Sequence, residues 1–446
     1  MPSRSSGHSA RVTPLPAVDP MPPHATGPIP WLGAGLGLLR DPTAHLTKLR
    51  RRLGDTFVLD GLGYRLFFVF SAAGVRALYA APEEQASFGL ATFELVLKRK
   101  IPFELAAGRR TLPHDLFKNP DVETYLANLE RAVALEIEAL GTSGTFEAFS
   151  EAKRLGYRLG LASWAGEEAA SPRHLPALID AFERLDASDS FVRPLGTAWS
   201  MVTKKRGEWK AMAEVEAIIS AVLQSRRATG RRPGDYLDQI EEAFSDLPLT
   251  ERDVQVARDL MIIQMGAQSN LFAALAWTLV NLLLHPDVLA RVRAGDDALL
   301  ERAASESIRL AQRSLTLRQV LSPFEVATET GTYTLAPGVL LATLLSVTNP
   351  TAAPGLDRFD PDHYAGRKVA DTVALPAREL VSTFGHGRHA CPAQRFSLSA
   401  IRIAVRRLLD AYDLVPRFTA ARPLARQIGG VARAARPCRI AYTARS

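Results

Sequence analysis

Residues 384–392 read FGHGRHACP, and they carry Cys391, one of only two cysteines in the 446-residue chain. Pro392 follows the cysteine at once, and an apolar-periodic, arginine-rich run follows Pro392. Proline is favoured at the first position of a helix, where its missing N–H would have no intrahelical partner. We therefore expect Cys391 at the N-cap of a helix, where free N–H groups and the helix dipole stabilise a thiolate. Gly385 and Gly387 allow backbone angles that let the loop pass close to a flat ligand.

The alternative for any lone cysteine is a buried structural role. The pattern here is more specific, because the stretch matches F-x-x-G-x-[HR]-x-C through Phe384, Gly387, His389 and Cys391. On these residues it resembles the haem-binding loop of the cytochrome P450 superfamily. One departure is that the family usually has glycine two residues after the cysteine, where this chain has Ala393.

The composition is that of a globular protein, with 47% hydrophobic and 23% charged residues. Two cysteines exclude a disulfide framework, and the first 30 residues contain no continuous apolar stretch typical of a signal peptide. We therefore expect a cytoplasmic protein. Residues 1–28 are rich in Pro, Ser and Gly and predict a flexible leader, followed by one catalytic domain over residues 29–446.

Positive charge is concentrated near the end of the sequence. From Arg395 onward there are eleven Arg, no Lys and two Asp, a net charge of +9 (11 − 2), whereas the whole chain carries +7. Nucleic-acid binding is disfavoured because the arginines form no known nucleic-acid-binding motif. A solvated surface is one explanation, and a face that steers an acidic protein partner is the other. We favour the partner because Cys391 lies next to this segment.

The remaining chain is mostly helical by its apolar periodicity. A helix is expected over residues 42–53, ended by Gly54, and then a hairpin around residues 61–63. Helices follow over most of residues 71–244, and strand-like segments occupy residues 316–347. No internal repeat is visible.

A long helix is expected over residues 250–284, ended by His285-Pro286. No Asp, Glu, Lys or Arg lies between Asp259 and Asp287, so a membrane span must be considered. Several polar side chains in this stretch would be costly in lipid without partners. A helix buried in the core of a globular protein without stable membrane insertion is therefore preferred.

Three residues outside the loop take structural roles by the resemblance. Glu306 and Arg309 form an E-x-x-R pair on one helical face, upstream of the cysteine loop, in the same order as in the family. The resemblance implies that this pair is buried and stabilises the segment below the haem. His363 stands where the family has an arginine as third partner, and this replacement keeps a donor but loses the fork shape of the guanidinium.

The resemblance also implies haem contacts. Arg318 and His389 occupy positions like those of haem-propionate ligands, where charge-assisted hydrogen bonds are expected. His114 and Lys118 are candidates for a further propionate contact. Gly266 fits the groove over which oxygen and substrate lie.

The middle of the long helix departs from the usual family pattern of an acid followed by threonine, which assist proton delivery. Here the corresponding catalytic candidates are Gln268, Ser269 and Asn270. Gln268 can position water but cannot act as an acid, and Ser269 supplies a hydroxyl. This Q-x-N arrangement resembles the subset of the superfamily with sterol hydroxylases and prostacyclin-synthase-like isomerases.

The resemblance implies a mainly α fold with a small β portion, in a single cytochrome P450-like domain that binds haem b through Cys391. The first expectation for its activity is a monooxygenase that hydroxylates or epoxidises an apolar small molecule, with electrons from an acidic ferredoxin or flavodoxin. A peroxide isomerase or dehydratase that needs no reductant is the alternative. A non-catalytic haem-binding protein is the third.

Overall fold

The computed structural model describes residues 22–27, 33–61, 63–107, 110–111, 117–186 and 199–445. Most of the expected leader lies outside these residues. For residues 22–27 the expectation of a flexible leader is wrong, because His24–Ala25 forms strand β1 and pairs in parallel with strand β2. The pairing satisfies backbone groups that an edge strand would otherwise present to solvent.

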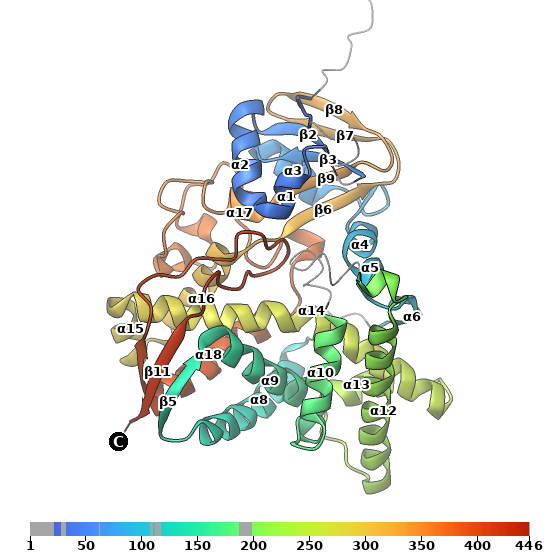
Figure 1. Cartoon of the computed structure of the whole chain (residues 1–446), viewed down its shortest axis with the longest axis vertical. Coiled ribbons are helices and arrows are strands. Elements are labelled where there is room, and N and C mark those ends of the chain that lie inside the picture. The colour runs from blue at the N-terminus through green and yellow to red at the C-terminus, as the bar shows by residue number, and fades with distance from the viewer. Residues whose placement is uncertain are drawn as a thin grey trace, which may run out of the picture.

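Helices dominate the described chain (Figure 1). The α-helices are α1 (Leu36–Arg40), α2 (Pro42–Leu53), α3 (Ala72–Ala80), α4 (Phe88–Thr92), α5 (Lys98–Lys100), α6 (Phe103–Ala106), α8 (Asn119–Leu140), α9 (Ala148–Ala169), α10 (Leu175–Leu185), α12 (Arg206–Thr229), α13 (Tyr236–Ala243), α14 (Leu249–Leu284), α15 (Pro286–Arg293), α16 (Asp297–Ala311), α17 (Leu345–Thr348) and α18 (Gln394–Ala411). A π-helical turn, η1, spans Phe93–Leu97, and the 3-10 turns are η3 (Pro361–Tyr364), η4 (Val369–Asp371), η5 (Arg378–Leu380) and η6 (Gly387–His389).

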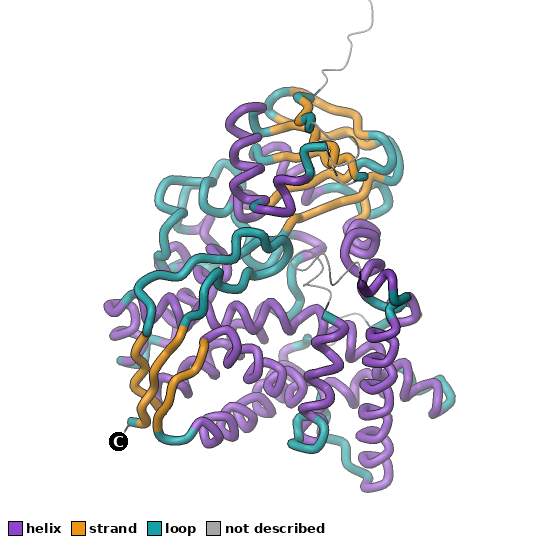
Figure 2. Tube along the Cα trace, in the orientation of Figure 1, coloured by secondary structure: helices purple, strands orange, loops and turns teal. Residues whose placement is uncertain are grey.

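Strands gather at one end of the molecule and in a small sheet near the C-terminus (Figure 2). They are β1 (His24–Ala25), β2 (Thr56–Gly61), β3 (Tyr64–Val69), β4 (Ala86–Ser87), β5 (Ser143–Glu147), β6 (Leu315–Val320), β7 (Phe324–Thr328), β8 (Gly331–Leu335), β9 (Leu340–Leu344), β10 (Tyr412–Pro416) and β11 (Arg439–Ala444). The largest sheet has the order β1-β2-β3-β9-β6-β4; β10-β11-β5 and β7-β8 form the other two. The expectation of a mainly α fold with a small β portion is confirmed.

The local signals near the N-terminus led to correct predictions. Helix α2 begins at Pro42 behind the N-cap Asp41, whose carboxylate accepts a hydrogen bond from the Ala44 N–H at 2.9 Å. It ends at Gly54, whose φ of 89° only glycine adopts readily. Strands β2 and β3 then pair in antiparallel fashion around residues 61–64, as the hairpin pattern predicts.

Helix α14 is the expected long helix and begins one residue earlier, at Leu249. It crosses the middle of the molecule and packs against α9, α12, α16 and α18 (Figure 1). Among the described residues it is the helix long and apolar enough to cross a membrane, and 78% of its apolar window lies buried inside the protein. Burial on most sides is typical of a core helix.

The largest sheet brings distant segments to one place. Strand β6 lies between β9 and β4, and its Val320 and Gln319 pair with Ala86 and Ser87. Residues 79–89 therefore lie beside Arg318, although more than 200 positions separate them in the sequence.

Candidate active site

The loop that carries Cys391 closes on itself. The Cys391 N–H donates to the Phe384 carbonyl oxygen at 2.7 Å, so the two ends of the motif meet. Gly385 has a φ of 79°, and a Cβ on it would lie 2.6 Å from the His389 carbonyl oxygen. Gly387 has a φ of 62°. Both glycines are therefore required by the backbone path of the loop.

Cys391 is not the N-cap of the following helix, and this expectation is wrong. Helix α18 begins at Gln394, with Ala393 as its N-cap, because Pro392 and Ala393 form a turn before it. Burial raises the pKa of the Cys391 thiol, and a hydrogen bond from the Ala393 N–H opposes that rise. A backbone donor to the sulfur favours its thiolate form.

Cys391 is a free, partly exposed thiol. Within the part of the chain that the structure describes, no three His, Cys, Asp or Glu residues come together as a metal site. A single cysteine thiolate on a glycine-containing loop can serve as the axial ligand of a haem iron.

Arg318 and His389 converge on one carboxylate, that of Glu83. Arg318 Nη1 lies 3.2 Å from Glu83 Oε2, and His389 Nε2 lies 3.3 Å from the same oxygen. Arg318 comes from β6, whereas His389 ends η6, two residues before Cys391. The structure thus brings together the two residues expected to bind propionates, in an arrangement that already binds a carboxylate.

These observations fit a haem group. The thiol, the two glycines in positive φ and a carboxylate-binding pair lie within or against one short loop. Cys391 would hold the iron, while Arg318 and His389 would bind a propionate, which is also a carboxylate. His114 lies outside the described residues, and Lys118 is the residue that precedes helix α8.

The Glu306–Arg309 pair is fully buried on helix α16. Arg309 donates from Nε to Glu306 Oε2 at 2.7 Å and from Nη2 to Glu306 Oε1 at 2.6 Å. His363 Nδ1 lies 3.0 Å from Glu306 Oε1, so it stands as the third partner. Arg309 Nη1 also donates to the Leu356 carbonyl oxygen at 2.7 Å, which ties the segment after α17 to α16.

Asn349, which belongs to no motif identified in the sequence, joins this pair to the cysteine loop. Its Nδ2 donates to the carbonyl oxygens of Arg309 and Ser382, both at 3.0 Å, and its Oδ1 accepts from the Ser382 N–H at 2.8 Å. Ser382 Oγ in turn accepts from the Gly385 N–H at 3.1 Å. The buried pair therefore positions the loop through a continuous chain of hydrogen bonds.

The candidates on α14 lie on different faces of the helix. Gly266 is exposed, and a Cβ on it would meet no atom of the described residues within 4 Å. Gln268 is 2% exposed, and neither polar atom of its amide has a hydrogen-bond partner among the described residues. It shares its face with Gln264, which lies against Gly160 of α9. Gln268 thus points into the helix packing rather than along the face of Gly266.

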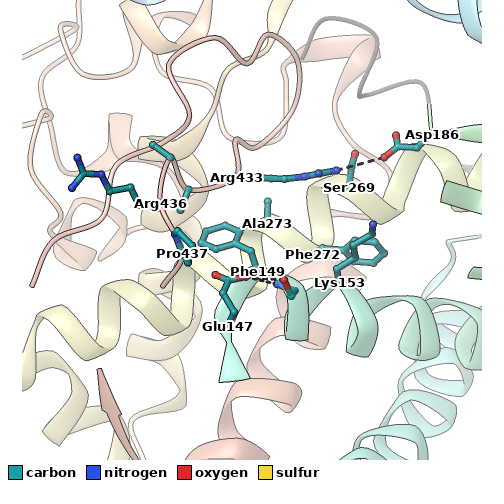
Figure 3. A pocket seen from close by; sticks show the side chains of 13 residues that line it. Glu147, Phe149, Lys153, Asp186, Ser269, Phe272, Ala273, Arg433, Arg436 and Pro437 are labelled. Carbon is teal, nitrogen blue, oxygen red and sulfur yellow. Dashed lines mark hydrogen bonds and ion pairs between the residues drawn. The ribbon is translucent and has the colours of Figure 1, made fainter. Parts of the chain in front are cut away.

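Ser269 borders a cavity of about 400 Å³ between α9, α14 and residues 433–437 (Figure 3). Its apolar lining includes Phe149, Phe272 and Ala273. At the far side Arg433 reaches toward Asp186, 3.8 Å away, and Ser269 points toward this pair (Figure 3). A hydroxyl beside an apolar surface can orient a polar group on an otherwise apolar ligand.

Two hydrogen bonds attach the C-terminal loop to α14. Asn270 Oδ1 accepts from the Val431 N–H at 2.9 Å, and Trp277 Nε1 donates to the Ala432 carbonyl oxygen at 2.6 Å. A Cβ on Gly430 would lie 2.3 Å from Asn270 Oδ1, so only glycine fits there. Asn270 thus links the helix to the loop that forms one wall of the cavity.

Two of the four arginines of α18, Arg402 and Arg406, form ion pairs with acidic residues of α16. Arg406 forms an ion pair with Asp297 at 2.6 Å, and Arg402 pairs with Asp297 at 3.2 Å and Glu301 at 3.0 Å. Arg407 is exposed, as is Arg388 in the cysteine loop. The surplus positive charge in the sequence is therefore partly neutralised within the fold.

No protein-family model matches the chain. Curated relatives are nevertheless similar over nearly its whole length. The 24-hydroxycholesterol 7-alpha-hydroxylase of Mus musculus is 22% identical over 95% of this chain and 93% of that protein. The lanosterol 14-alpha demethylase of Bos taurus is 22% identical over 91% of this chain and 84% of that protein. A Penicillium shearii protein, cytochrome P450 monooxygenase esdpI, is 27% identical over 54% of this chain and 52% of that protein.

A solved structure shares the fold. Retinoic acid-bound cyanobacterial CYP120A1 superposes with a TM-score of 0.73 at 19% sequence identity. The match covers 96% of this chain and 100% of that one, so the described elements form one domain of a known architecture.

Proposed function

Since the chain belongs to the cytochrome P450 superfamily, we propose that it hydroxylates or epoxidises an apolar small molecule with dioxygen and electrons from a redox partner. It is an oxidoreductase whose cofactor is haem with an axial thiolate. The observation that carries the proposal is the free thiol of Cys391, on a loop that also holds His389 beside a carboxylate.

Haem with a thiolate ligand supplies electron density that favours cleavage of an O–O bond. Groups of the protein itself act on the sulfur and on proton delivery. The Ala393 N–H donates to the Cys391 sulfur and tunes its basicity. Ser269 Oγ both donates and accepts hydrogen bonds, so it can hold a proton-carrying water beside the cavity, whereas the Asn270 amide cannot release a proton at neutral pH.

We infer an isoprenoid-derived substrate, a terpenoid or steroid, ahead of a lipid or polyketide. The names of two relatives include 24-hydroxycholesterol and lanosterol, and the similar structure holds retinoic acid. These molecules are largely apolar, and each carries one or two polar groups. The cavity beside Ser269 combines the same features, with Phe149 and Phe272 next to Arg433.

For the electron donor we propose an acidic ferredoxin or flavodoxin. The net charge of +9 after residue 394 supports a basic docking face, and the exposed Arg388 and Arg407 are its best candidates. Arg402 and Arg406 contribute less, because Asp297 neutralises part of their charge. Docking of this kind weakens as salt rises.

We further propose a cytoplasmic location without stable membrane insertion and without nucleic-acid binding. The burial of α14 supports the lack of stable membrane insertion, since most of its apolar surface is already covered by protein. The two free cysteines suit a reducing compartment.

Purified holoenzyme tests the proposal. It is first checked for the thiolate signature in the carbon-monoxide difference spectrum, and is then given fatty-acid hydroperoxides without reductant. In parallel it is given terpenoids and steroids with a ferredoxin system. We expect oxygenated products only with the reductant. Rapid rearrangement of a hydroperoxide without reductant would instead establish a peroxide isomerase and overturn the proposal.

A further inference from the structure

Glu83 lies between α3 and β4, in a segment for which the sequence showed no motif. One carboxylate oxygen, Oε1, accepts from Ser87 Oγ at 2.6 Å and from the Gly89 N–H at 3.0 Å. The other, Oε2, faces Arg318 and His389 at 3.2 and 3.3 Å. A single side chain therefore connects the start of α4, strand β6 and the cysteine loop.

The contacts hold this carboxylate in place. Burial alone would raise the pKa of Glu83, but hydrogen bonds from Ser87 and from the Gly89 and Phe88 N–H groups, with the charge of His389, lower it to about 2. The Phe88 ring also lies against the His389 ring, with centroids 4.6 Å apart. Glu83 is thus charged at neutral pH and fixed at the edge of the cysteine loop.

Arg318 keeps capacity for a second carboxylate. It is 3% exposed and donates to Glu83 Oε2, to the Ala86 carbonyl oxygen and to the Tyr79 carbonyl oxygen. These contacts use three of the five N–H groups of a guanidinium. A buried arginine needs a counter-charge, which Glu83 supplies within the chain.

We propose that Glu83 is an internal counter-charge that shares Arg318 and His389 with a haem propionate and thereby weakens the retention of haem. The inference rests on haem as the cofactor. Two carboxylates on one arginine repel each other, and each reduces the net attraction that the other gains. Glu83 is a positioning residue here, since it acts on the propionate through Arg318 and His389.

Haem loss from the ferric holoenzyme to excess haem-free myoglobin measures this effect. In Glu83→Gln the shape of the side chain is kept and its charge is removed. We expect haem loss about three- to tenfold slower than in the wild type, because the repulsion between carboxylates disappears. A purely structural role for Glu83 predicts the opposite sign, faster loss, so unchanged or faster loss overturns the inference.

Two further variants of Glu83 and one control variant complete the test. Glu83→Asp keeps the charge and is expected to lose haem faster than Glu83→Gln; Glu83→Ala removes the carboxylate and is expected to slow the loss, which serves if Glu83→Gln does not fold. Glu329→Gln is the matched control, because Glu329 also accepts a backbone N–H, from Ala73, but lies on the β7–β8 turn. A wild type without a haem band would refute the cofactor itself, whereas a normal band with unchanged loss in Glu83→Gln refutes only the role of Glu83.

Discussion

The guanidinium of Arg309 and the carboxylate of Glu306 form two parallel hydrogen bonds, of 2.7 and 2.6 Å, with both side chains fully buried. Neither group reaches solvent, so each depends on the other for compensation of its charge. Through Asn349 the pair also sets the position of Ser382 and hence of the cysteine loop. Its integrity should therefore affect both folding and cofactor loading.

Glu306→Ala should lower the free energy of unfolding by about 3–5 kcal/mol, because it leaves the Arg309 charge buried without its partner. Urea unfolding followed by circular dichroism measures this loss. The matched control is Glu94→Ala, which breaks the exposed Glu94–Lys98 pair and should cost less than about 1 kcal/mol. Equal costs for the two variants would contradict the buried role.

Cys391→Ala should abolish the thiolate signature in the carbon-monoxide difference spectrum, since the chain then has no sulfur on the loop. Cys438→Ala serves as the control, because that thiol is buried and its Sγ lies 3.7 Å from the Arg436 carbonyl oxygen, away from the loop. We expect the control to retain the signature. An unchanged spectrum in Cys391→Ala would refute the assignment of the axial ligand.

Gln268→Met should raise the free energy of unfolding by about 1 kcal/mol, because it replaces a buried amide that has no partner among the described residues by an apolar side chain of similar volume.

Asn270→Ala should instead lower the free energy of unfolding by about 1 kcal/mol, because the hydrogen bond from the Val431 N–H is lost. Turnover should fall more in Asn270→Ala. The reverse order of turnover would mean that Gln268 takes part in proton delivery.

Glu208 predicts a pH dependence of stability. Burial would raise its pKa from the ordinary 4.5, but hydrogen bonds from Lys100 and Ser200 lower it below that value. A depressed pKa in the folded state stabilises the protein above the ordinary pKa, and this contribution disappears as the pH falls through the folded value. The stability difference between wild type and Glu208→Gln should therefore be constant near neutral pH and shrink below a pH of about 4.5.

Thermal unfolding of both proteins at several pH values checks this. Lys100→Met supplies the control, since it removes the 2.8 Å ion pair that helps to depress the pKa. In that background the pH dependence should weaken. A difference that grows on acidification would contradict the assigned sign.

The sequence was most informative where a pattern is local. The loop of residues 384–392, the E-x-x-R pair and the capped helix α2 each lie within a few turns of chain, so spacing alone predicts their form. The sequence did not predict which side chains of α14 point into the core. This helix is buried on most sides, and its apolar pattern marks no single inner face. Gln268 and Asn270 could therefore not be placed on their faces in advance.

Polar contacts between residues far apart in the sequence could not be predicted from the sequence either. Glu83 meets Arg318 across 235 positions, and Asn349 meets Ser382 across 33, with no short motif around either residue. Cys391 was placed at the N-cap because proline at the first helical position is common, yet Pro392 starts a turn instead. Such details depend on how the loop packs, which spacing does not encode.

Two hydrogen bonds, from the Val431 N–H to Asn270 Oδ1 and from Trp277 Nε1 to the Ala432 carbonyl oxygen, fix the C-terminal loop to α14 over two helical turns. The wall that this loop contributes to the cavity includes the small residues Ala434 and Ala435 beside Arg433 and Arg436. The shape of this space is thus set by a loop near the end of the chain as well as by Ser269, Phe272 and Ala273 of α14. Under the proposed function, substitutions at Ala434 or Ala435 would change which molecules fit without altering the loop that carries Cys391.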